Sequence, residues 1–208
     1  MKKPPKLDLP LYCTAKLQTM RGKKADMKKI DTPRLTLRPL AQSDLEDFFE
    51  LVSNKRVAKM AGFSAAPSLE NAGYVMQRYL NNPLAMGIEL KPTRRLIGTI
   101  ELFERMTNHG IPDQFAWDLG YSLQEATWGH GYMTEAGHVF LAQAVRDTPV
   151  EAIYASFLVE NERSKHVLEK LGFHYEGEVK HPEFALFAAG QHEIIYKQTR
   201  DEFLKRMD

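Results

Sequence analysis

The sequence predicts a mixed α/β domain whose central sheet is mostly antiparallel and has about six to seven strands. Short runs in which apolar and polar residues alternate indicate strands, and longer runs with apolar residues three or four positions apart indicate helices. These runs follow one another as strand, two helices, three strands, helix, strand, helix and two strands. The three consecutive strands in the middle favour an antiparallel meander.

Each predicted element has its own local signal. The elements are, in order, a strand at 34–40, a helix at 43–52, a loop at about 54–67, a helix at 68–80, strands at 84–91, 95–104 and 115–123, a helix at 133–145, a strand at 152–159, a helix at 161–171 and strands near 173–181 and 191–199. Ser43 and Glu46 form the pattern of a capping box. The long polar loop at 105–114 is a candidate substrate loop.

The second half of the domain contains the stronger helix signals. Met133, Ala136, Phe140 and Ala144 form one apolar stripe, and Gly137 allows close packing beside it. The run at 152–159 is apolar almost without alternation, which is typical of a central strand covered on both faces. The last predicted helix is capped by Asn161 and ends at Gly172.

The composition indicates one domain with a basic arm. The 208 residues are 43% hydrophobic and 26% charged, which is enough for one sizeable core. We expect an arm at residues 1–29 and a single domain at 30–208. The arm carries nine Lys or Arg against two Asp, and the remaining chain has 19 basic and 25 acidic residues. Because the arm lacks interleaved aromatic residues, we expect no nucleic-acid partner.

Several other classes of protein are not expected. No apolar run is long enough to cross a membrane and the amino terminus lacks the pattern of a secretory signal, so we expect a cytoplasmic protein without a membrane partner. The single cysteine, Cys13, can form neither an internal disulfide nor a zinc cage. None of the seven histidines has ligand spacing, so no metal is expected. Monomer and homodimer both stay open.

Two glycines mark the junction between the third strand of the meander and the helix that follows. Gly129 and Gly131 flank His130 in the stretch "ATWGHGYMTEA". The first amides of a helix have no partner and the helix dipole makes that end positive, so a glycine-lined entry favours an anion. The alternative is a tight turn without a ligand. No GxxxxGK[ST] pattern is present, and Thr134 replaces the third glycine of a dinucleotide fingerprint.

Five segments in the same order resemble the GNAT superfamily of coenzyme A-dependent N-acetyltransferases. They are "TPRLTLRPL", "GYSL", "WGHGYMTEA", "NERSKHVLEKLGF" and "GQHEIIY", between residue 32 and residue 196. The ensemble is similar to the branch that contains the Rim-type ribosomal-protein N-terminal acetyltransferases. The glycine pair fits the family pattern Q/R-x-x-G-x-G/A, except that Ala126 stands at the Gln/Arg position.

The resemblance implies a GNAT-like sheet with helices on both faces and central strands that splay apart. It also implies acetyl-CoA as the co-substrate. The loop amides that would bind the diphosphate are those of Gly129, His130, Gly131, Tyr132, Met133 and Thr134. The pantetheine arm would bond to the backbone of Tyr121, Ser122 and Leu123, and Asn161 would fix the cofactor arm through its amide.

The chemistry that the resemblance implies is direct attack of a primary amine on the thioester. The amine needs a base and the leaving thiolate needs an acid. The resemblance to the Rim-type enzymes assigns the base to Glu183 and the acid to Ser164. Many relatives use a tyrosine as the acid, but this chain has Leu168 at that position, which favours Ser164. Asp118 and Glu101 are reserve candidates for the base. In the simpler alternative, Ser164 only bonds a backbone group in the first helical turn.

Two functions of different class follow from these residues. One is an N-acetyltransferase acting on a small amine or on the α-amino group of a protein or peptide. The other is a catalytically inactive module that binds acyl-CoA as a sensor. The loops at 54–67 and 105–114, which would border the acceptor site, contain no recognisable code. The acceptor therefore stays open among ribosomal proteins, polyamines, amino acids, antibiotics and other amines.

Overall fold

The computed structural model describes residues 27–106, 110–183 and 190–207. Most of the predicted basic arm, with Cys13, lies outside these residues. The elements, in chain order, are β1 (Ile30–Asp31), β2 (Leu35–Arg38), a 3-10 turn (Gln42–Asp44), α1 (Leu45–Ser53), α2 (Lys55–Ala61), α3 (Leu69–Leu80), β3 (Ala85–Leu90), β4 (Arg95–Met106), β5 (Pro112–Leu123), a 3-10 turn (Glu125–Thr127), α4 (Tyr132–Asp147), β6 (Ala152–Leu158), α5 (Glu162–Leu171), β7 (His174–Lys180), β8 (His192–Thr199) and α6 (Arg200–Met207). The predicted mixed α/β class is confirmed.

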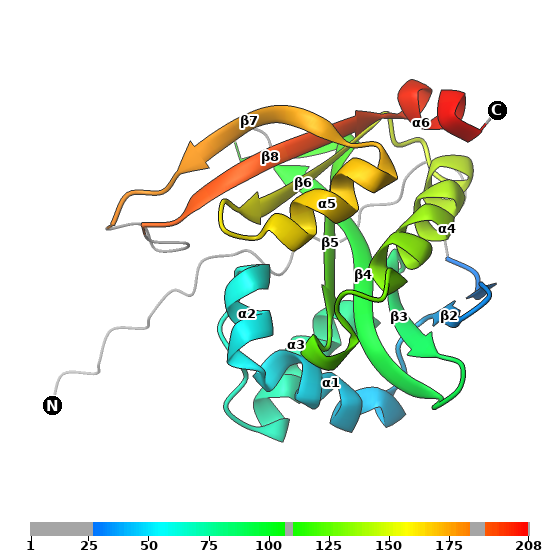
Figure 1. Cartoon of the computed structure of the whole chain (residues 1–208), viewed down its shortest axis with the longest axis vertical. Helices are drawn as coiled ribbons and strands as arrows, with labels where there is room; N and C mark the ends of the chain where they lie inside the picture. The colour runs from blue at the N-terminus through cyan, green and yellow to red at the C-terminus, as the bar shows by residue number, and fades with distance from the viewer. Residues whose placement is uncertain (1–26, 107–109, 184–189, 208) are drawn as a thin grey trace, which may run out of the picture.

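One sheet organises the described chain, with strands in the order β1-β2-β3-β4-β5-β6-β8-β7 (Figure 1). Neighbouring strands are antiparallel except β5 and β6, which are parallel. The described sheet has eight strands, more than predicted, because the two-residue β1 is too short to show a pattern. Helices cover both faces, with one core beneath α4 and α5 and another beneath α1, α2 and α3.

The two central strands splay apart, as the resemblance predicts. β5 and β6 are paired only from Ala116–Ala152 to Asp118–Tyr154. Beyond these pairs, the last residues of β5 continue along β4, while those of β6 continue along β8. Because β6 borders the opening, only one of its faces is fully covered, and Ser156 is exposed. The prediction of a strand covered on both faces is therefore wrong.

The helix α4 packs as its sequence predicts. The stripe of Met133, Ala136, Phe140 and Ala144 is buried. A Cβ added at Gly137 would lie 2.7 Å from Cδ1 of Leu171, so a glycine is required where α4 crosses α5. The predicted caps of α5 are also confirmed, with Oδ1 of Asn161 accepting the amide of Ser164 and Gly172 in the left-handed region.

Four local predictions are corrected by the structure. The predicted loop at 54–67 contains α2, which Asn54 caps and the left-handed Gly62 ends. The capping box of Ser43 and Glu46 does not form; Asp44 instead accepts the amide of Ala41 and binds Arg38. The strands β4 and β5 extend into the predicted loop at 105–114, of which 107–109 is not described. The short polar end that the sequence predicts after the last strand is instead the helix α6.

Candidate active site

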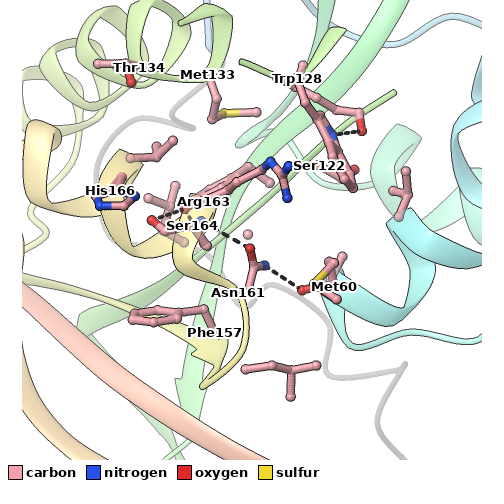
Figure 2. Close-up of a pocket in the computed structure, with 18 of the residues that line it drawn as sticks. Met60, Ser122, Trp128, Met133, Thr134, Phe157, Asn161, Arg163, Ser164 and His166 are labelled. Atoms are coloured by element: carbon pink, nitrogen blue, oxygen red, sulfur yellow. Dashed lines mark hydrogen bonds between the residues drawn. The ribbon is translucent and has the colours of Figure 1, made fainter. Parts of the chain in front are cut away.

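A cavity of about 350 Å³ lies in the opening between β5 and β6 (Figure 2). The end of β5 forms one wall, β6 and α5 form the second, and α2 together with the loop before α4 closes the rim. The predicted site residues that line it are Tyr121, Ser122, Leu123, Gly129, Gly131, Tyr132, Met133, Thr134, Asn161 and Ser164. The residues named from separate segments of the sequence thus meet at one place.

The glycine loop adopts the backbone that its sequence favours. Gly129 and Gly131 have φ of +79° and +77°, in the left-handed region that residues with a side chain rarely adopt. A Cβ at Gly129 would meet nothing within 4 Å, so the loop is open on that side. Gly131 is the N-cap of α4, whose first-turn amides have no acceptor within the helix.

Charged side chains clamp this loop from the turn before β2. Nη1 of Arg34 donates to the carbonyl oxygen of His130 over 2.8 Å, and its Nε donates to Glu135 over 2.6 Å. Burial opposes ionisation of Glu135, but hydrogen bonds from Thr32 and Arg34 hold the pKa of this carboxyl below its usual value. The guanidinium of Arg34 also lies 4.6 Å from the centre of the Tyr132 ring. The clamp therefore fixes the loop to the turn before β2.

The His130 side chain takes no part in the described cavity wall. Its ring stacks on that of Tyr132 with centroids 5.5 Å apart, and its Nδ1 lies 2.8 Å from the carbonyl oxygen of Trp128. Trp128 itself lines the cavity, and the guanidinium carbons of Arg56 and Arg163 lie 5.4 and 5.2 Å from its ring centre.

Ser164 has a phenol as its neighbour. Its Oγ lies 2.6 Å from the hydroxyl oxygen of Tyr121, and either atom can be the donor. Burial raises the pKa of Tyr121, although the hydrogen bond with Ser164 opposes this, so the phenol stays protonated at neutral pH. The sequence interpretation named Tyr121 for its backbone alone. Tyr121 lies on the face of β5 that the helices cover, and this position was the signal in the sequence that its side chain also belongs to the site.

The Asn161 amide is occupied at both ends. Besides the cap at its oxygen, its Nδ2 donates to the carbonyl oxygen of Met60 over 2.9 Å (Figure 2). This bond joins α2 to the start of α5 across the cavity. This bond uses one of the two N–H groups of Nδ2, so a ligand can accept a hydrogen bond from the other.

The three predicted carboxylates lie outside the described cavity wall. Glu183 is exposed, and its carboxylate folds over Gly190 at the β7–β8 turn. Asp118 binds Nη1 of Arg105 at 2.5 Å; burial raises its pKa, and Arg105 opposes the shift. Glu101 is buried and binds Nη2 of Arg78 at 2.7 Å.

One carboxylate in the cavity wall was not predicted. Glu193 on β8 is the only Asp or Glu among the described residues that line the cavity. It is paired across the strands with Leu158, the last residue of β6. An acidic residue inside the predicted strand at 191–199 was a visible signal in the sequence. What could not be read was that β8 lies next to β6, since this depends on non-local pairing.

Comparisons with known proteins agree with this geometry. Residues 34–174 match the family model described as the acetyltransferase (GNAT) domain. The uncharacterized N-acetyltransferase YoaA of Bacillus subtilis (strain 168) is 28% identical over 153 residues, which cover 71% of this chain and 84% of YoaA.

Solved structures share the fold. A GNAT-family acetyltransferase from Bacillus anthracis has a TM-score of 0.72 at 20% identity, covering 84% of this chain and 99% of that one. The ribosomal-protein-S5-alanine acetyltransferase of Vibrio fischeri has a TM-score of 0.67 at 21% identity, covering 85% and 99%. The spermidine N-acetyltransferase of Vibrio cholerae, solved with CoA and spermine, has a TM-score of 0.68 at 19% identity, covering 83% and 99%.

Proposed function

The chain belongs to the GNAT acetyltransferase family and is therefore an acetyl-CoA-dependent acyltransferase; on this premise we propose that it acetylates the nitrogen of a primary amine. The observation that carries the proposal is the cavity between the diverging strands β5 and β6, with the glycine loop at its rim. In the described part of the chain, no helix is long and apolar enough to pass through a membrane.

The residues at the rim fit acetyl-CoA. A diphosphate needs several backbone donors that no side chain covers, and the open face of the Gly129–Gly131 loop next to the α4 N-terminus offers this arrangement. We assign the diphosphate to the amides of residues 129–134. The pantetheine arm would lie along Tyr121, Ser122 and Leu123, beyond the last residue of β5 that is paired with β6. Asn161 would contact this arm through the second N–H of its Nδ2 group, while the first stays on the Met60 carbonyl.

Ser164 is the proposed proton donor to the leaving thiolate. Ser164 lines the cavity, and its Oγ lies 2.6 Å from the hydroxyl oxygen of Tyr121. Because burial keeps the phenol of Tyr121 protonated, Tyr121 can donate into the Ser164 oxygen while the Ser164 proton points toward the sulfur. Tyr121 is in this proposal a positioning residue, since it acts through Ser164.

The acceptor is proposed to be a small amine or the α-amino group of a protein or peptide. Similarity in fold to an enzyme named for alanine of ribosomal protein S5 supports the α-amino group and the Rim-type branch. Similarity to an enzyme named for spermidine supports a small polyamine. A carboxylate must take the proton of the acceptor ammonium in either case, because a primary amine is mostly protonated at pH 7. The resemblance assigns this role to Glu183.

The test is thiol release from acetyl-CoA with a panel of amines. The panel contains spermidine, free amino acids, and short peptides in matched pairs with free and N-acetylated termini. Turnover with the free peptide alone identifies an α-amino acceptor. Ser164→Ala should lower kcat about 100-fold, the low end of the range for general acid–base catalysis. Tyr121→Phe should lower kcat less.

Binding measurements complete this test. Acetyl-CoA affinity, measured by calorimetry, should stay unchanged in Ser164→Ala, because the loop that is proposed to bind the diphosphate is not altered. Tight binding without turnover on any amine would favour the binding-only sensor. Absence of binding would contradict both functions.

A further inference from the structure

The charged residues of the described cavity wall are divided by sign. Arg163, His166 and Lys170 lie on α5, the helix that flanks the predicted cofactor groove, whereas the one carboxylate, Glu193, lies on β8. An anionic co-substrate matches the basic helix, and an ammonium matches the acidic strand. Resting on the proposed function, we infer that Glu193 binds the ammonium of the acceptor and removes its proton.

The position of Glu193 suits this role. Its strand continues the sheet beyond β6, so it shares the wall of the cavity with Ser156 and Leu158. Its side chain is one-quarter exposed, so a ligand can reach it without unfolding. Ser164, the proposed acid, lines the same cavity from α5.

The carboxylate of Glu193 is free to act as a base. No described residue is within hydrogen-bonding distance of its oxygens; the Nε2 atom of His181 lies 3.8 Å from Oε1. Asp118 is a second ionisable neighbour of Glu193. Burial and Arg105 have the largest effects on the Asp118 pKa, and the charge of Glu193 also contributes to raising it. Beyond these groups, the Glu193 oxygens are available to a cationic ligand.

The other carboxylates are less available. Asp118 is held by Arg105, and Glu101 is held by both Arg78 and Asn82. Glu183 is exposed at the β7–β8 turn and lies outside the described wall. Glu193 is the one candidate that combines access to the cavity with oxygens that no described cation binds directly.

The proposed step is balanced as follows. The ammonium gives one proton to the Glu193 carboxylate, and its nitrogen lone pair forms a C–N bond with the thioester carbonyl carbon. The tetrahedral adduct then breaks its C–S bond, and the thiolate takes a proton from Ser164. The new amide nitrogen loses its second proton, which restores the hydroxyl through solvent, while Glu193 returns its proton to solvent. The products are the N-acetyl amine, the free thiol and one proton.

The experiment compares Glu193→Gln with Glu183→Gln, the variant of the competing candidate for the base, and with a control, Glu176→Gln, on the best acceptor of the panel. We expect Glu193→Gln to lower kcat at pH 7 by about 100-fold or more and to leave the calorimetric affinity for acetyl-CoA unchanged. The Glu176→Gln control should stay close to wild type, because Glu176 lies on β7 outside the described cavity wall. In Glu193→Gln the rate should rise about tenfold per pH unit below the acceptor pKa, because the reaction then depends on amine that is already neutral. A purely structural defect would not give this slope.

Glu193→Ala keeps the question open to refutation if the amide variant fails to fold. It should bind acetyl-CoA normally and turn over more slowly than wild type. Wild-type kcat in either folded Glu193 variant would overturn the role of Glu193 and leave the transferase function intact. Loss in Glu183→Gln alone would return the base to Glu183. A wild-type protein that binds acetyl-CoA but acetylates no amine would overturn the proposed function, and the role of Glu193 with it.

Discussion

The two ends of the cavity are built differently. At the loop end, the backbone amides belong to two left-handed glycines and one helix N-terminus. Arg34 holds this loop through hydrogen bonds to Glu135 and to the His130 carbonyl oxygen. At the other end, where the acceptor is proposed to bind, side chains from α2, β5, α5 and β8 converge. The buried Nε2 of His181, next to Glu193, has no hydrogen-bond partner among the described residues. A diphosphate is common to every reaction of this co-substrate, whereas the acceptor differs between enzymes. The rigid end therefore suits the constant ligand, and the less saturated end suits the variable one.

The largest effect that would test this contrast is expected at the loop. Gly131→Val forces a β-branched residue into φ of +77°, which costs about 1–2 kcal/mol or more of backbone strain. The acetyl-CoA dissociation constant should rise at least about tenfold if this strain moves the loop amides. Calorimetry measures the affinity, and the acceptor KM should change much less.

Gly110→Val is the matched control for this prediction. Gly110 has φ of +70° and nothing within 4 Å of an added Cβ, and it lies outside the cavity wall. The control should lose comparable stability in thermal unfolding but keep its affinity for acetyl-CoA. Equal affinities in Gly131→Val and wild type would contradict the assignment of the diphosphate to this loop.

A smaller effect is expected at Asn161, which lines the cavity at the start of α5. Asn161→Ala removes the cap of α5, which costs about 1 kcal/mol of stability, and also removes the bond to the Met60 carbonyl. Because Ser164 lies in the capped turn, kcat should fall about tenfold through misplacement of its hydroxyl. Thermal unfolding and steady-state kinetics give the two values.

Asn161→Ser separates the two contributions of Asn161. A serine keeps an oxygen that can cap α5, but it is too short to reach the Met60 carbonyl. Stability should return close to wild type, and any remaining loss of kcat then reports on the bond to α2. If Asn161→Ala is as active as wild type, the acceptor end does not depend on this helix start.

The smallest effect is expected from Arg34→Gln, because its ion pair with Glu135 is half exposed and worth about 1 kcal/mol or less. The acetyl-CoA affinity should fall a few-fold. The pKa of Glu135 is lowered on folding, so its contribution to stability is present above about pH 4.3, the unfolded value, and is lost as the pH falls through the folded pKa. The stability difference between Arg34→Gln and wild type should therefore shrink below that pH.

Lys29→Gln is the control for the Arg34 variant. Lys29 forms an exposed ion pair with Asp31 at 3.4 Å in the same part of the chain, away from the loop. Removing this lysine should leave the affinity for acetyl-CoA unchanged. An Arg34→Gln protein that binds acetyl-CoA as tightly as wild type would show that the glycines hold the loop without the clamp.

The sequence by itself determined the features that a few neighbouring residues encode. The apolar stripe of α4, the cap at Asn161 and the glycine pair could be predicted because periodicity, capping and left-handed backbone act within one or two helical turns. The proposed cofactor wall followed from these, since the groups proposed to bind the cofactor are mainly backbone amides next to the glycines. The short helix α2 was missed, although Asn54 and Gly62 signal its ends, because seven residues show too little periodicity.

Only the tertiary structure decided which side chains share the cavity. Tyr121 meets Ser164 across 43 positions of sequence, and Glu193 reaches the wall because β8 is paired with β6. The pairing of β4 with β5 places Asp118 beside Arg105, and α3 brings Arg78 to Glu101 on β4, so neither carboxylate is free. Strand order and register are set by the packing of the whole sheet, and a shift of one residue would turn each of these side chains to the opposite face. Local patterns therefore predict the backbone part of the site, and the fold selects the carboxylate.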